Sequence, residues 1–371
     1  MEIGIDVRSA FRKKKGGIGV CLNNLVNELL KIDRENYYIL YIDDNCDLPL
    51  PNNSNVRIRK LEFPFNSLWT QIRVQVDLFK YQPDIFYFTG HSIPLFCKTK
   101  SIVNIYDLTF LRTRGRKILH QLTTVILTKL AVNRSFHIIT ISNSTKKDLI
   151  HHYHLPDDKI SVIPLAYDKK LFHQNYDRNL INEIKRKYKI YNNYILWVGT
   201  ISPHKNVVRL IKAYNKLKKE GKIQHNLVIA GSKGWLYEDV FKTVDFLNLK
   251  NDVIFLDYVK LEDLPLLYSG ASIFVFPSLY EGFGLPILET MACGCPVVAS
   301  NVASIPEVVG DAALLFNPYN MNDIAEKILT VLENKQLKSE LINKGIKRLS
   351  EFSWEKTALQ TLEVFKKVHE K

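Results

Sequence analysis

At 371 residues, 46% of them hydrophobic, the chain is too long for one ordinary domain and can bury the cores of two. Its five cysteines do not have the number or spacing of a disulfide-rich or zinc-binding protein. It carries no signal peptide and no apolar run of membrane length, so we expect a cytoplasmic protein.

The net charge of +13 is concentrated in the first half of the chain. Residues 1–170 hold 25 Lys and Arg against 16 Asp and Glu, a net of +9. Basic clusters lie at residues 12–15, 57–60 and 112–117, near Phe63, Phe65 and Trp69. A solvated surface explains any one cluster, whereas three in one domain favour an anionic partner, such as a lipid surface, a lipid diphosphate or a nucleic acid.

The first domain, expected over residues 1–168, alternates strands and helices in the manner of a Rossmann-like α/β domain. Short apolar runs predict strands at residues 2–7, 37–43, 55–60, 84–88, 101–105 and 137–141. Helices are expected at residues 20–31, 69–81 and 146–153. The glycine-rich loop around Gly17, between the first strand and the first helix, would let a phosphate approach the backbone.

Polar residues follow several of these strands at their carboxyl ends, where ligands bind in open α/β sheets. His91 follows the fourth strand, and Tyr106 and Asp107 follow the fifth. We expect them to face one crevice, with His91 and Asp107 as the candidates for chemistry. A loop histidine with a backbone partner explains His91 equally well.

The second domain is expected over residues 169–350, followed by a last helix in residues 351–371. Strands are predicted at residues 194–198, 227–230, 253–256, 272–276, 297–299 and 313–316. Helices are predicted at residues 207–220, 264–269, 287–292, 322–333 and 335–350, with a further helix starting at residue 305. Gly199, His204 and Lys205 lie in the first strand–helix loop, where the Lys205 ammonium could meet a phosphate.

The stretch from Phe274 to Glu289 predicts an anion site. A buried strand leads into a loop with two glycines, and Pro286 suits the first turn of the following helix. Backbone N–H groups at such a helix start, together with the helix dipole, favour a phosphate. Because ionised carboxylates only accept hydrogen bonds, Glu281 and Glu289 could bind hydroxyl groups on either side of it. A nucleotide sugar has this combination of a diphosphate and hydroxylated groups.

The segment Glu281-Gly-Phe-Gly-Leu-Pro-Ile-Leu-Glu289 resembles the Glu-x7-Glu signature of retaining family-4 glycosyltransferases. The resemblance implies the GT-B architecture, in which two Rossmann-like doubly wound domains face each other across a cleft. It also implies that the last helix, residues 351–371, crosses back to the first domain. It also implies that Glu289 binds the nucleotide ribose and Glu281 lies near the transferred sugar. Backbone donors to the sugar and the diphosphate would come from Gly282, Phe283, Gly284 and Leu285.

Two positions depart from the family pattern. Family members often carry His-Asp where this chain has Tyr106-Asp107, and a basic pair such as Arg-Lys where it has His204-Lys205. On this basis we expect Glu281, Lys205 and Asp107 to be catalytic. Gly17, Gly199 and His204 are expected on the donor side, and His91 and Tyr106 on the acceptor side.

The expected reaction moves a hexose to a lipid-linked or oligosaccharide acceptor in polysaccharide assembly, for example of lipopolysaccharide. The resemblance alone suggests mannose from GDP-mannose as the first candidate donor. The chain has no Asp-x-Asp motif, so we expect a metal-independent site with no cofactor beyond the nucleotide-sugar co-substrate. The basic loops predict peripheral association with the anionic inner face of a membrane.

Three alternatives compete with this hypothesis. A nucleotide-sugar epimerase or hydrolase of the same architecture could use His91 or Asp107 on a water or a proton. A basic nucleic-acid-binding protein would fit the charge, but no RNA-binding aromatic signature or zinc module is present, so nucleic acid is not an expected partner. A catalytically inactive scaffold would not need both glutamates and Lys205.

Overall fold

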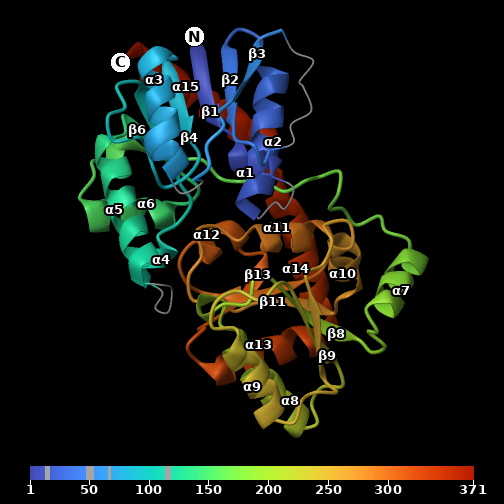
Figure 1. Cartoon of the computed structure of the whole chain (residues 1–371). Helices are drawn as coiled ribbons and strands as arrows, with labels where there is room; N and C mark the ends of the chain where they lie inside the picture. Colours follow the sequence, from blue (N-terminus) through green and yellow to red (C-terminus); the bar gives the residue numbers. More distant parts are fainter. Residues whose placement is uncertain (13–16, 47–53, 66–67, 113–117) are drawn as a thin grey trace. The chain divides into compact units, whose positions relative to one another are not determined.

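The computed structural model describes residues 1–12, 17–46, 54–65, 68–112 and 118–371 (Figure 1). The described chain forms two compact units. Unit 1 consists of residues 1–112, 118–166 and 352–371, and unit 2 of residues 167–351. Of the basic clusters, residues 13–15 and 113–117 lie outside the described part of the chain.

Unit 1 contains a parallel sheet in the order β3-β2-β1-β4-β5-β6-β7. The order reverses at β1, as in a doubly wound Rossmann-like sheet. Its strands are β1 (Glu2–Asp6), β2 (Tyr37–Ile42), β3 (Val56–Lys60), β4 (Ile85–Phe88), β5 (Lys100–Ile105), β6 (His137–Thr140) and β7 (Ile160–Val162).

Helices cover both faces of this sheet, because its central strands are apolar on both sides. On one face, α2 (Gly17–Ile32) and α15 (Trp354–Glu370) pack on Ile3 and Ile5 of β1. On the other face, Phe86 and Phe88 of β4 lie in a core with residues of three further helical segments. These segments are Trp69–Val74, a π-helical turn that continues into α3 (Gln75–Lys80), then α5 (Ile118–Arg134) and α6 (Asn143–Tyr153). Short helices α1 (Arg8–Phe11) and α4 (Thr109–Arg112) follow β1 and β5.

Unit 2 contains a second parallel sheet, in the order β10-β9-β8-β11-β12-β13. Its strands are β8 (Tyr194–Val198), β9 (Asn226–Ala230), β10 (Val253–Asp257), β11 (Ile273–Phe276), β12 (Val297–Ser300) and β13 (Ala313–Phe316). Its helices are α7 (Arg178–Lys187), α8 (Val207–Lys219), α9 (Glu238–Phe246), α10 (Leu264–Gly270), α11 (Leu285–Ala292), α12 (Ile305–Val309), α13 (Met321–Glu333) and α14 (Lys335–Arg348).

Alternation along β11 shows how the two faces of this sheet are filled. Ile273 and Val275 point into the core formed with α8, α9 and α13. Phe274 points to the opposite face, where its ring meets Tyr268 of α10 at 5.6 Å between centroids. Two doubly wound parallel domains, as predicted, are therefore confirmed.

The five cysteines are free thiols. None of the helices in the described part of the chain combines the length and apolarity needed to cross a bilayer.

Candidate functional site

The candidate site lies in unit 2, where the strand order of the sheet reverses. β8 and β11 are neighbours there, while β9 and β10 extend the sheet to one side and β12 and β13 to the other. The loops after β8 and β11 therefore lie next to each other at the carboxyl end of the sheet, where ligands bind in open α/β sheets. These loops contain Lys205 and Glu281 respectively.

An ion pair joins the two loops. Lys205 Nζ lies 2.6 Å from Glu281 Oε1, and both side chains are mostly buried, at 17% and 13% exposure. The backbone reinforces this contact, since the Leu279 N–H donates to the His204 carbonyl at 2.7 Å. The sequence predicted both charges as site residues, and the fold brings them together from positions 76 residues apart.

Asn206 provides a second connection between the same two loops. It adopts a left-handed backbone conformation with φ 59°, which asparagine tolerates better than most residues. Its side-chain amide donates to the carbonyls of Pro277 at 3.0 Å and Pro318 at 2.9 Å. This buried residue was not among the predicted site residues, because its partners are distant in sequence.

The second loop runs directly into the start of α11. Gly284, with φ 127°, precedes the helix, and no side chain caps it, which suits a helix start that receives an anion. Ser304 Oγ lies 2.9 Å from the Glu281 carbonyl and 2.8 Å from the Phe283 carbonyl, and so fixes the loop from behind. Gly282 and Phe283 are buried, and Leu285 is the first helical residue.

Glu289 lies one turn further along α11. Its Oε2 accepts a hydrogen bond from the Tyr268 hydroxyl at 3.0 Å. Burial raises the pKa of Glu289 from 4.5 to about 7, and the Tyr268 hydrogen bond offsets part of this effect. Burial, followed by the Glu289 charge, raises the pKa of Tyr268 well above its usual range. Glu289 can therefore gain or lose a proton near neutral pH.

Glycines allow two loops to meet at the end of β8. A Cβ on Gly231, after β9, would lie 1.8 Å from the Gly199 carbonyl oxygen, and the φ of Gly231 is +149°. Gly231 is therefore required by this approach, whereas Gly199 is favoured by its own φ of +155°. Beside them the His204 ring stacks on Trp235 at 5.2 Å, and its Nδ1 lies 3.2 Å from Ser202 Oγ.

Two predicted residues of unit 1 have structural surroundings that were not expected. Tyr106 was placed on the acceptor side, but its side chain is only 6% exposed and lies among core residues of β4, β5 and α15. Burial raises its pKa above the usual range. Asp107 Oδ1 accepts a hydrogen bond from the N–H of Thr109, the first residue of the short helix α4, at 2.7 Å.

The remaining predicted residues of unit 1 lie at two other positions. His91, in the loop after β4, is partly exposed and packs edge-on against the ring of Phe110 at 5.6 Å. Gly17 is the first residue of α2, and a Cβ there would meet no atom within 4 Å. Gly17 is therefore not required by packing within the described part of the chain.

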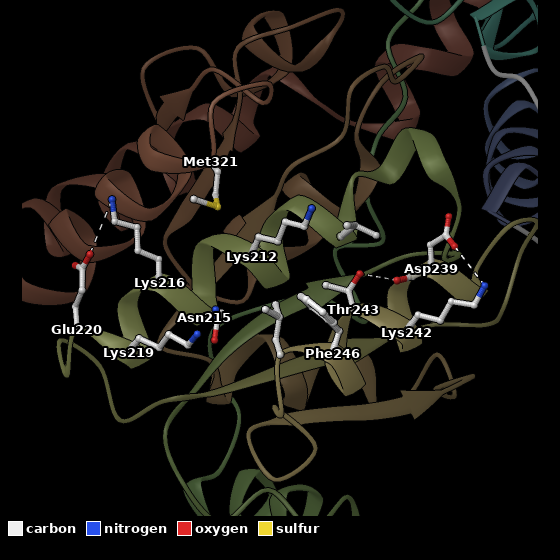
Figure 2. Close-up of a pocket in the computed structure, with 12 residues that line it drawn as sticks. Lys212, Asn215, Lys216, Lys219, Glu220, Asp239, Lys242, Thr243, Phe246 and Met321 are labelled. Atoms are coloured by element: carbon white, nitrogen blue, oxygen red, sulfur yellow. Dashed lines mark hydrogen bonds and ion pairs between the residues drawn. The ribbon is translucent and has the colours of Figure 1, made fainter.

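A large surface cavity of unit 2 lies away from these residues. It has a volume of about 900 Å³ and runs along the outer sides of α8 and α9. Figure 2 shows the Lys216–Glu220 and Lys242–Asp239 ion pairs along it, with Phe246 beside them. Neither Lys205 nor the two glutamates line it, so size alone does not identify the site.

Comparison with known proteins gives the family. Residues 181–348 match the model of "Glycosyl transferases group 1", and residues 15–171 match that of "Glycosyltransferase Family 4". The O-antigen chain mannosyltransferase RfbU of Salmonella typhimurium is 32% identical over 264 residues, which cover 71% of this chain and 68% of RfbU. The chain belongs to the group 1, family-4 glycosyltransferases.

Other glycosyltransferases resemble this one over different parts of their length. The O-antigen chain mannosyltransferase B of Escherichia coli is 36% identical over 230 residues, which cover 62% of this chain and 60% of the relative. This glycosyltransferase thus matches less than two thirds of that relative's length. Anabaena HepE, in a crystal structure with UDP and glucose, shares the fold with a TM-score of 0.77 at 19% identity, over 98% of this chain and 99% of HepE.

Proposed function

We propose that this glycosyltransferase transfers a hexose from a nucleotide sugar to a glycan acceptor in the assembly of a cell-surface polysaccharide, with retention of anomeric configuration and without a metal. Mannose from GDP-mannose is the proposed donor. The observation that carries the proposal is the Lys205–Glu281 pair beside the start of α11, at the switch point of the second sheet. The names of the two O-antigen mannosyltransferases support the choice of mannose.

The charges of the site suit the departure of a diphosphate. When the bond between the anomeric carbon and the diphosphate oxygen breaks, negative charge grows on the leaving group. The Lys205 ammonium and the N-terminal dipole of α11 oppose that charge. The acceptor hydroxyl forms the new bond, and its proton passes to the leaving diphosphate or to solvent.

The ion pair also prepares the site for its donor. Two mostly buried charges neutralise each other, which avoids the cost of an unpaired buried charge. A diphosphate at the start of α11 would compete with Glu281 for Lys205. The Glu281 oxygens would then accept hydrogen bonds from sugar hydroxyls, while Glu289 accepts them from the ribose. Glu281 would thereby move from partnering Lys205 to holding the sugar.

For the acceptor we propose a lipid-linked or oligosaccharide glycan, met at the inner face of an anionic membrane with which the protein associates peripherally. The basic first half of the chain and the O-antigen relatives support this proposal. His91, the partly exposed candidate of unit 1, is the residue we propose on the acceptor side.

Thermal unfolding with nucleotide sugars tests the proposal. A ligand that binds only the folded state raises the melting temperature, by an amount that grows with concentration over Kd. We expect GDP-mannose to raise it more than UDP-, dTDP- or ADP-sugars, and Glu281→Gln to reduce the shift. Mannose transfer from radiolabelled donor to an oligosaccharide acceptor completes the test. No shift with any nucleotide sugar, or conversion of the sugar without transfer, would refute the proposal.

A further inference from the structure

One helical segment of unit 1 turns apolar side chains toward solvent. From residue 68 to the end of α3, the exposed positions are Leu68 at 44%, Ile72 at 43%, Val76 at 44%, Phe79 at 56%, and Lys80. Their spacing of three to four residues places the four apolar side chains along one face of the helix. Apart from Lys80, the exposed positions of this segment are therefore hydrophobic, whereas an ordinary surface helix exposes polar residues.

The opposite face of the same segment already provides its packing. Trp69, Val74 and Leu78 are buried in the core of unit 1. Asp77 is also buried there, and its carboxylate pairs with Arg59 at 2.6 Å. The outward apolar side chains are thus not needed to hold the helix on the sheet.

A neighbouring loop extends the apolar surface. The Phe96 N–H donates to Gln75 Oε1 at 2.7 Å, so the loop after β4 lies against the middle of the helical segment. Gln71 fixes the same loop through the Ile93 carbonyl at 2.8 Å. Phe96 is 66% exposed and Leu95 is 39% exposed. We call the six exposed side chains the apolar face, namely Leu68, Ile72, Val76, Phe79, Leu95 and Phe96.

The charged residues of the two segments that carry this face are mostly basic. From Phe63 to Gln82 the only acidic residue is Asp77, which is buried, whereas Lys80 is exposed. Residues 85–106, which include the loop with Leu95 and Phe96, contain no acidic residue, and Lys98 is exposed there. Such a surface repels a second copy of itself and attracts an anionic one.

We propose that the apolar face docks the protein on the surface of an anionic lipid bilayer, with its side chains at the level of the headgroups and with Lys80 and Lys98 on lipid phosphates. The inference rests on the proposed function in that it names the surface which meets the membrane. It also revises the expectation drawn from the sequence. Trp69 is buried, with the Arg8 guanidinium 3.7 Å above its ring, and so does not reach the lipid.

Co-sedimentation with vesicles tests the assignment, and needs neither donor nor acceptor. The probes are vesicles of phosphatidylglycerol mixed with phosphatidylcholine, and of phosphatidylcholine alone. The variant is Ile72→Glu with Phe79→Glu, and the matched control is Phe246→Glu, which alters a phenylalanine of unit 2 that is 85% exposed. Unchanged thermal unfolding and circular dichroism establish that each variant is folded.

We expect the wild type and Phe246→Glu to sediment with the anionic vesicles. The double variant should lose at least about tenfold in partitioning, which corresponds to 1.4 kcal/mol. Equal binding of the double variant, or no binding of the wild type to anionic vesicles at low salt, would overturn the proposal. So would equal binding to neutral vesicles, or a wild-type dimer that the double variant abolishes without lipid. We expect the double variant to retain sugar transfer to a soluble acceptor. Measuring this transfer distinguishes a failure of the docking proposal from a failure of the proposed reaction.

Discussion

Replacing Glu289 with glutamine removes a buried charge while keeping the size of the side chain. The carboxyl group has a pKa of about 7 in the folded protein and 4.5 as its ordinary value. A carboxyl group with a raised pKa supports folding fully below its unfolded pKa and loses that contribution as the pH rises through the folded pKa. The wild type is therefore expected to lose stability, relative to Glu289→Gln, as the pH rises from about 5 to about 8.

The size of this loss follows from the two pKa values. At about 1.36 kcal/mol per unit, linkage gives a relative loss of about 2.5 kcal/mol between about pH 5 and pH 8. This is an upper limit, because Glu289 keeps part of its surface in contact with water. Glutamine also retains an oxygen that can accept the Tyr268 hydrogen bond, so the variant should pack as the wild type does.

Equilibrium urea denaturation of both proteins at several pH values measures this difference. Other titrating groups cancel, because only Glu289 differs between the two proteins. Glu262→Gln, at an exposed position of unit 2, corrects for the general loss of one negative charge. Glu289→Gln should also bind GDP-mannose tenfold to over a hundredfold more weakly than the wild type, since a charged hydrogen bond contributes about 1.5–3 kcal/mol. Glu262→Gln should bind it as the wild type does. A stability difference that stays constant with pH would refute the reasoning.

Three further predictions concern the ion pair, the metal requirement and the glycines. Lys205→Ala and Glu281→Gln should each lower kcat/KM at least about tenfold in steady-state kinetics. The double variant should lower kcat/KM by less than the product of the two single effects, because the residues form one pair. A loss equal to that product would contradict this. Transfer activity should persist in EDTA, and loss that magnesium or manganese restores would contradict a metal-independent site. Thermal unfolding should show that Gly231→Ala destabilises the protein by more than about 3 kcal/mol, because the new Cβ would overlap the Gly199 carbonyl. Gly221→Ala, whose Cβ would have no atom within 4 Å, should destabilise it by about 1 kcal/mol.

Local patterns sufficed for much of the fold, because both sheets are built from short apolar runs bounded by turns. The helix α5 escaped prediction. Its Thr123, Thr124, Val125 and Ile126 favour strands locally, and its apolar residues do not form a single stripe. The helix α9 was also missed; it is only nine residues long. Tertiary packing determines that both segments are helical, and the local sequence pattern does not reveal that packing.

The site shows the same division between local and distant information. Glu281, Lys205 and Glu289 could be predicted as candidates, because Lys205 and Glu281 lie in loops that follow strands and Glu289 lies in the helix that begins after the second loop. Their supports could not, because Asn206 and Ser304 act through carbonyls far away in the chain. The burial of the Tyr106 ring was also not predicted, because it depends on residues that are distant in the chain.

The return of α15 to unit 1 has a consequence for synthesis on the ribosome. Ala358, Phe365 and Val368 complete the core around α2, yet they emerge more than 300 residues after β1. Unit 2 is continuous from residue 167 to 351 and can close its core first. Until α15 has been synthesised, unit 1 exposes the apolar surface that α15 will cover. Exposed apolar surfaces of this kind are bound by chaperones. Truncation before residue 354 should therefore damage the unit made first more than the unit next to the cut.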